Sequence, residues 1–271
     1  MSRDTKLILG LPIDNVTMDQ AVQRIFDLID RYEKYKQPRL VVTVHIDFVV
    51  QAISWWPKCR LRHPEFLDII KRAALVTADG MPIVWAGRLL GTPLKGRVTG
   101  ADLVPRLAEA AAEHGKSIYF LGGHEGVGEK AAEILKQRHP NLEIAGIDAP
   151  YVHIEGETSS LIQEDKPIVD RINDSGTHIL LIAFGCPKQE LWFERNKHRL
   201  NVPISIGVGG TFEFIAGTIA RAPVWMQKYG AEWIFRVSQE PERLWKRYFF
   251  GFLKFSIIFM RSFFNSQVIY E

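Results

Sequence analysis

The chain has 271 residues, of which 46% are hydrophobic and 24% charged, and its formal net charge is +3. This apolar content is enough for a substantial core, so the composition excludes an intrinsically disordered chain. The two cysteines lie far apart in the sequence. The polar N-terminus is followed by too few apolar residues to form the core of a signal peptide. We therefore expect a cytoplasmic globular protein with one large domain, or a domain plus an appendage.

Apolar runs alternate with helical patterns along the first 217 residues. Runs typical of buried strands lie at 6–11, 40–44, 74–78, 117–121, 142–147, 178–184 and 204–208. Helical spacing, with Thr17 as a cap of the first segment, covers 18–35, 101–114, 126–138, 167–173 and 188–197. The polar stretch 151–166 is expected to be a surface loop. The alternation predicts an α/β fold, a Rossmann-like and mostly parallel sheet with helices on both faces.

The last part of the chain has a different character. We expect an α/β core over 1–217 and a basic, aromatic-rich helical appendage over 218–271. Between 221 and 261 there are eight lysines and arginines but only three acids. The following apolar stretch is interrupted by Lys254 and Arg261, which favours a helix lying at a membrane surface over one spanning it. Packing on the core or on another subunit is the alternative.

One acid, Asp79, directly follows a predicted strand in the tripeptide Ala78-Asp79-Gly80. In an open α/β sheet, ligands bind beyond the carboxyl ends of the strands, which places Asp79 where chemistry is performed. An aspartate before a helix that begins near Met81-Pro82 is also a common N-cap. Both interpretations remain open from the tripeptide alone.

Three further strand ends are followed by glycine-bearing loops that lead into helices. Such junctions let backbone amides approach a phosphate, although tight turns without a ligand have the same pattern. Because parallel strands end on one side of a sheet, these loops and Asp79 are expected to converge. The residues concerned are Gly122, Gly123, Gly185, Lys188, Gln189, Gly209, Gly210 and the nearby Glu213.

Metal and dinucleotide motifs are weak or missing. There is no Asp-x-Asp pair, and the eight histidines show no ligand spacing, so we expect no metal and no cofactor. Gly126-x-Gly128-x-x-Ala131 is a poor dinucleotide fingerprint because its glycines fall inside the predicted helix. It keeps a nicotinamide-dependent oxidoreductase as one alternative function.

Taken together, motifs along nearly the whole chain resemble the WecG/TagA/CpsF family of bacterial glycosyltransferases (glycosyltransferase family 26). The chain departs from the family pattern at His45, where the family usually has Asn, and at Glu213, where it usually has Asp. The matching motifs are Thr43-Val44-His45, Ala78-Asp79-Gly80, Gly91, 97–103, Leu121-Gly122-Gly123, 185–190, 207–214, Arg221-Ala222-Pro223, Glu232-Trp233 and 240–243.

The resemblance implies an inverting, metal-independent transfer of a sugar from a UDP-sugar to a polyprenyl-diphosphate-linked sugar at the inner face of the cell membrane. On this basis Asp79 is expected to be the general base, with Thr43, His45 and Gln189 orienting hydroxyl groups. Arg97 is expected to contact the acceptor or its diphosphate, or else to pair with Asp102 or another acid. The glycine loops, with Lys188 and Glu213, would bind UDP, and the appendage would contribute Arg236, Arg243 and Arg247 to a diphosphate or to lipid head groups.

The expected partners are thus a UDP-sugar, a lipid-linked sugar and a membrane surface, with no nucleic acid. Exposed apolar residues of the appendage also make a homo-oligomer an open possibility. A non-catalytic adaptor that senses UDP-sugar at the membrane is the second alternative function.

Overall fold

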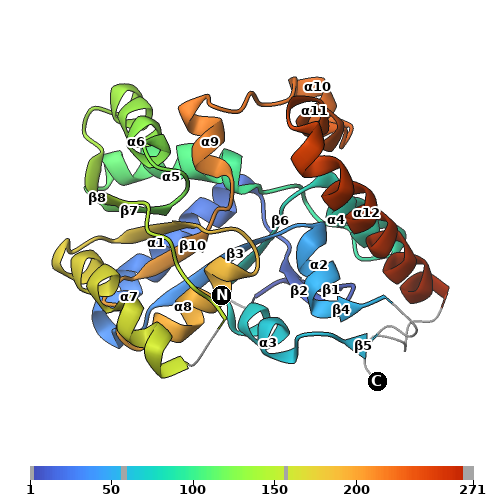
Figure 1. Cartoon of the computed structure of the whole chain (residues 1–271), viewed down its shortest axis with the longest axis horizontal. Helices are drawn as coiled ribbons and strands as arrows, with labels where there is room; N and C mark the ends of the chain where they lie inside the picture. The colour runs from blue at the N-terminus through green and yellow to red at the C-terminus, as the bar shows by residue number, and fades with distance from the viewer. Residues whose placement is uncertain (1–2, 56–59, 156–157, 265–271) are drawn as a thin grey trace.

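The computed structural model describes residues 3–55, 60–155 and 158–264 (Figure 1). Its centre is one sheet in which every pair of neighbouring strands is parallel, in the order β6-β3-β10-β9-β7-β8. The strands are β3 (Arg39–Val44), β6 (Leu75–Ala78), β7 (Ser117–Gly122), β8 (Glu143–Asp148), β9 (Ile179–Ala183) and β10 (Ile204–Gly207). The predicted α/β class and parallel sheet are confirmed.

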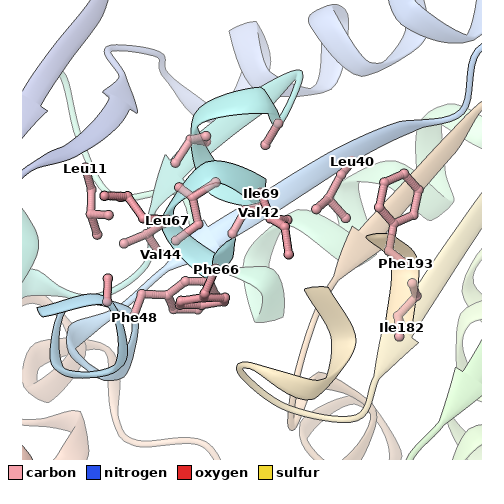
Figure 2. Close-up of a cluster of buried hydrophobic side chains, with 14 of the residues drawn as sticks. Leu11, Leu40, Val42, Val44, Phe48, Phe66, Leu67, Ile69, Ile182 and Phe193 are labelled. Carbon is pink, nitrogen blue, oxygen red and sulfur yellow. The ribbon is translucent and has the colours of Figure 1, made fainter. Parts of the chain in front are cut away.

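Helices cover both faces of this sheet, because alternate strand residues point to opposite sides. On β3, Val41 packs into one core, whereas Leu40, Val42 and Val44 pack into the other (Figure 2). The first core is closed by α1 (Met18–Tyr35), α5 (Gly100–Glu113), α6 (Val127–Arg138) and α9 (Thr211–Ala216). The second is closed by α2 (Ile46–Ala52), α3 (Pro64–Arg72), α4 (Met81–Leu89), α7 (Thr158–Asp174) and α8 (Lys188–Asn196).

The run 6–11 is not a strand of the main sheet, which corrects one expectation. It is divided between β1 (Thr5–Ile8) and β2 (Leu11–Asp14), which pair antiparallel. The two residues between them, Leu9 and Gly10, have φ values of 50° and 77°. Two consecutive positive φ values are typical of a tight hairpin turn. A second small antiparallel pair joins β4 (Ile53–Ser54) to β5 (Arg60–Leu61).

The expectation of a loop over 151–166 is wrong from residue 158 onward, where α7 begins. This helix buries Leu161, Ile168, Val169 and Ile172, a spacing that lies on one helical face. Pro167 lies within this helix. Because an interior proline usually signals a break, the helical spacing before it was not recognised from the sequence.

The appendage forms α10 (Val224–Lys228), α11 (Glu232–Gln239) and α12 (Pro241–Phe264), seen in orange to red in Figure 1. One face of α12 packs against α2 and buries Leu244, Phe255 and Ile258. Its other face exposes a stripe that includes Trp245 and Phe249. Among the described residues, none of the helices combines the length and hydropathy needed to cross a membrane. The domain boundary after residue 217 stays a prediction.

A buried carboxylate, Asp14, ties the hairpin to the sheet. It accepts hydrogen bonds from the guanidinium of Arg3 at 2.7 and 2.8 Å, from Arg24 at 3.2 Å and from the amide of Val76 at 2.7 Å. We expect Asp14→Asn to lower the free energy of unfolding by about 3 kcal/mol, because it leaves the half-buried guanidinium groups of Arg3 and Arg24 without their charge partner. Asp30→Asn, on the exposed side of α1, is the matched control. Equal denaturation midpoints for the two variants would contradict this role.

Candidate active site

A cavity of about 600 Å³ opens at the carboxyl ends of the strands. Residues that follow all six strands of the main sheet line it, and α11 and α12 contribute the opposite wall. Such a crevice is the usual ligand site of an open α/β sheet. The predicted site residues that line it are Thr43, His45, Asp79, Arg97, Gly123, Gly185, Lys188, Gln189, Gly209, Gly210, Glu213, Arg236 and Arg247. Gly122 is not among the lining residues, and the side chain of Arg243 lies outside those the structure describes.

Asp79 directly follows β6 in the chain, and its carboxylate contacts the first residue of α5. Its Oδ2 accepts from the backbone N–H of Gly100 at 3.2 Å, whereas α4 starts from Gly80 without a side-chain cap. Capping of α4 by Asp79, the alternative interpretation, is therefore wrong. Burial raises the pKa of Asp79 to about 7, against the lowering effect of the Gly100 amide. A carboxyl group with such a pKa can accept a proton near neutral pH.

Thr43 and His45 stand beside each other at the end of β3. The Thr43 hydroxyl donates to the carbonyl of Gly207 at 3.1 Å. His45 caps α2, and its Nδ1 accepts from the amide of Asp47 at 3.3 Å. Burial lowers the pKa of His45 against the opposing effect of Asp47, so the neutral ring is favoured. With Nδ1 acting as an acceptor, the neutral ring carries its proton on Nε2.

Gln189 joins two of the glycine loops. Its Oε1 accepts from the amides of Gly185 at 3.2 Å and Gly209 at 3.1 Å, and its Nε2 donates to buried Glu190 at 2.7 Å. Burial raises the pKa of Glu190 to about 8, so this carboxyl is mostly protonated at neutral pH. The side chain of Gln189 thus fixes the distance between the loops that follow β9 and β10.

The glycines at these junctions serve two different purposes. A Cβ on Gly122 would lie 2.8 Å from the ring of Phe184, so this glycine allows close packing. Gly185 and Gly209 have φ values of 77° and 52°, and a Cβ on either would meet nothing within 4 Å. At these two positions the backbone conformation needs glycine, and open space remains where a Cβ would lie, while both amides donate to Gln189.

Arginines from both parts of the chain surround the cavity. Arg97 pairs with Glu232 of α11 at 3.2 Å and lies 3.7 Å from Asp102. Arg247 pairs with Asp47, its Nε lying 3.0 Å from Oδ2. The guanidinium of Arg236 lies 4.8 Å from the centre of the Phe214 ring. Arg97 therefore forms ion pairs with acids, which was the alternative role expected for it. Arg236 instead lies above the loop that follows β10.

Several residues of the cavity wall received no role from the sequence. Arg221 pairs with Asp102 at 2.5 Å, and Trp233 stacks on Phe252 at 6.4 Å with the rings 17° from parallel. Glu232 and Tyr248 also face the cavity. The family motifs Arg221-Ala222-Pro223 and Glu232-Trp233 carried a signal for these positions, but spacing alone did not connect them to Asp79.

The described residues contain no group of three or more His, Cys, Asp or Glu side chains placed to hold a metal ion. Among the described residues, five cations line the cavity, namely Arg97, Lys188, Arg221, Arg236 and Arg247. They make the cavity suited to an anionic ligand such as a diphosphate.

A parallel α/β sheet with a partly buried acid, glycine-bearing loops and several cations at one cavity is an arrangement typical of enzymes. The profile of the glycosyl transferase WecG/TagA/CpsF family matches residues 6–268, and the chain belongs to this family. It is thus a glycosyltransferase, as the resemblance implied.

Two relatives illustrate the similarity. The N-acetylglucosaminyldiphosphoundecaprenol N-acetyl-beta-D-mannosaminyltransferase of Staphylococcus aureus (strain MRSA252) is 31% identical over 253 residues, covering 93% of this chain and 89% of the relative. The protein of the same name from Bacillus spizizenii (strain ATCC 23059 / NRRL B-14472 / W23) is 28% identical over 187 residues, covering 69% and 68%.

The raised pKa of Asp79 has a consequence for stability. Its ordinary value is 3.8 and its folded value about 7, so the folded state holds the proton more tightly and loses stability as pH rises between these values. Asp79→Asn removes this penalty. We expect the stability of Asp79→Asn relative to the unchanged protein to grow by on the order of 3 kcal/mol between about pH 4 and pH 8.

Urea denaturation at a series of pH values measures this difference. Asp68→Asn, on the exposed side of α3, is the matched control and should show no pH-dependent gain. If the stability difference between Asp79→Asn and the unchanged protein did not vary across this pH range, Asp79 would ionise normally in the fold.

Proposed function

We propose that this glycosyltransferase moves a sugar from a UDP-sugar to a sugar carried on a polyprenyl diphosphate, in the synthesis of a cell-envelope polysaccharide. The names of the relatives support the acceptor, since they are transferases that act on N-acetylglucosaminyldiphosphoundecaprenol. The cations of the cavity and the open space beside Gly185 and Gly209 support a nucleoside diphosphate as the leaving group.

The observation that carries the mechanism is the partly buried Asp79 at the floor of the cavity, with its raised pKa. Its carboxylate would take the proton from the acceptor hydroxyl while that oxygen bonds to the anomeric carbon of the donor. The bond from this carbon to the diphosphate oxygen breaks, and UDP leaves with the electron pair. A single displacement of this kind inverts the anomeric centre, and positioned base catalysis contributes roughly 10²–10⁴-fold.

The other lining residues are assigned supporting roles. Nε2–H of His45 would donate to a sugar oxygen, and Thr43 would contact a neighbouring hydroxyl. Gln189 would keep the loops of Gly185 and Gly209 at the spacing that receives a diphosphate, with Lys188 and Arg236 neutralising its charge. Because these cations would meet the diphosphate charge and the chain has no Asp-x-Asp pair, the proposed reaction uses no metal.

A screen of UDP-sugars against a short-chain polyprenyl-diphosphate N-acetylglucosamine acceptor, read by product mass, tests this function. We expect a product from the unchanged protein with an N-acetylhexosamine donor. Asp79→Asn should bind UDP with unchanged affinity in calorimetry but turn over at least about 100-fold more slowly, since it lacks the base.

Three outcomes would contradict the proposal. Near-normal turnover by Asp79→Asn rejects the base. Binding of NAD instead of UDP favours the oxidoreductase, and UDP-sugar binding without any turnover favours the adaptor.

We further propose that α12 rests on the inner face of the membrane, where the lipid-linked acceptor is held. Its exposed stripe presents Trp245 and Phe249, which are 47% and 61% exposed, and Lys246 lies beside them. Aromatic rings with neighbouring bases are typical of helices at an anionic lipid surface. The same face would pair two copies if no membrane were present.

Co-sedimentation with vesicles containing anionic lipid tests the membrane contact. We expect the double variant Trp245→Ala/Phe249→Ala to bind about tenfold or more weakly, because two aromatic side chains no longer enter the interface. Tyr35→Ala, an exposed aromatic at the end of α1 and remote from this stripe, should bind normally. Unchanged binding of the double variant, combined with loss of a dimer in sedimentation velocity, would assign the stripe to self-association instead.

A further inference from the structure

Four charged side chains form one cluster next to Asp79, and two of them come from the segment that covers the cavity. Arg97 and Asp102 belong to the core, whereas Arg221 and Glu232 lie after residue 217. Nη1 of Arg97 is 3.2 Å from Oε2 of Glu232, and Nη1 of Arg221 is 2.5 Å from Oδ1 of Asp102. Nε of Arg221 lies 3.6 Å from the second oxygen of Glu232, so charges alternate around the cluster.

The contacts of Arg97 all direct its guanidinium toward α5, α10 and α11. Besides Glu232, its Nη2 donates to Oε1 of Gln227 in α10 at 3.3 Å and lies 3.7 Å from Asp102. Gln227 is itself held by donation to the carbonyl of Ala222 at 2.7 Å. Among the described side chains, none of the lysines or arginines forms an ion pair with Asp79, whose carboxylate accepts from the Gly100 amide.

Arg97 is nevertheless close enough to act on Asp79 electrostatically. The charged groups that face Asp79 are Arg97, Asp102 of α5, Glu232 of α11 and Arg221. Arg97 favours the ionised carboxylate and lowers its pKa, whereas Glu232 and Asp102 raise it. If Glu232 were absent, Arg97 would still face Asp102 at 3.7 Å and would act on Asp79 without a competing partner in α11. A direct pair with Arg97 would make Asp79 a weaker base.

We propose that Glu232 is a positioning residue whose carboxylate holds the guanidinium of Arg97 away from Asp79, so that docking of α11 leaves the base without a cationic partner. Since this role rests on Asp79 being the base of the proposed function, it adds a reason why the appendage is needed for the reaction. The appendage then supplies an acid that sets the proton affinity of the base, in addition to any cations that contact the substrates.

The test is the pH profile of kcat/KM for Glu232→Gln, with Glu242→Gln as the matched control from the exposed first turn of α12. The acidic limb of the profile should move to lower pH by about one unit, because the carboxylate of Asp79 gains Arg97 as a partner and no longer faces the charge of Glu232. The plateau should fall roughly threefold to tenfold, because a less basic carboxylate takes the proton less effectively. The Glu242→Gln profile should match that of the unchanged protein.

A double-variant cycle shows whether Glu232 acts through Arg97. In an Arg97→Gln background, Glu232→Gln should move the limb by less than half as much as it does alone. An equal movement in both backgrounds, or a lower rate with an unmoved limb, would overturn the positioning role. Glu232→Asp keeps the charge with a shorter reach and should give an intermediate limb.

Carbon-13 NMR titration of the Asp79 carboxyl follows its pKa without any turnover. Glu232→Gln should lower this pKa by clearly more in the unchanged background than in the Arg97→Gln background, and an unchanged pKa or an equal shift in both backgrounds would be decisive against the role of Glu232. This readout also separates the two hypotheses. Near-normal turnover by Asp79→Asn rejects the base and leaves the NMR result standing, whereas an unmoved Asp79 titration rejects only the role of Glu232.

Discussion

All six strands of the main sheet run parallel, so each loop that leaves a carboxyl end opens into the same cavity. This constraint decides where every group of the site stands. It brings His45, Asp79, Gly123, Gly185 and Gly209 together although 164 positions separate the first from the last. It also leaves the far side of the cavity without a wall, because parallel strand ends supply only its floor. The α10–α12 segment fills that need, and its packing against α2 places its charges opposite the floor.

The floor of the site was predictable from sequence for the same reason. Continuous apolar runs mark buried parallel strands, and the residues after them must share one edge. Each of the two wrong predictions of secondary structure came from misreading one local feature. The Leu9-Gly10 turn splits a continuous apolar run into a hairpin, and Pro167 lies within a helix whose buried face extends to Leu161. The resemblance to the family named Arg236 and Arg247 of the wall. The pairing of Arg97 with Glu232 was not predictable, because these residues are 135 positions apart and neither pattern nor charge selects that pair.

Glycine content alone overstated the phosphate-binding surface. A Cβ on Gly128 would lie 2.9 Å from the side chain of Ile147, and one on Gly207 would lie 2.5 Å from the side-chain nitrogen Nε2 of Gln189. These glycines, like Gly122, permit close packing of the fold and leave no room for a ligand. Gly185 and Gly209 differ, since space remains in front of them while Gln189 ties their amides together. The distinction between a packing glycine and a ligand-facing one depends on neighbours that are remote in sequence.

The charges of the cavity show why an acid of the appendage can face an anion-binding site. Glu232 and Asp102 each pair with Arg97 or Arg221, so these four groups nearly cancel one another. Attraction of a diphosphate then falls to the cations outside this cluster, among them Lys188 at the start of α8 and Arg236 above the loop after β10. Asp79 stays in a region of low net charge and remains basic enough to take a proton. Separating the two groups of cations would let the proposed site bind an anion without lowering the pKa of its base.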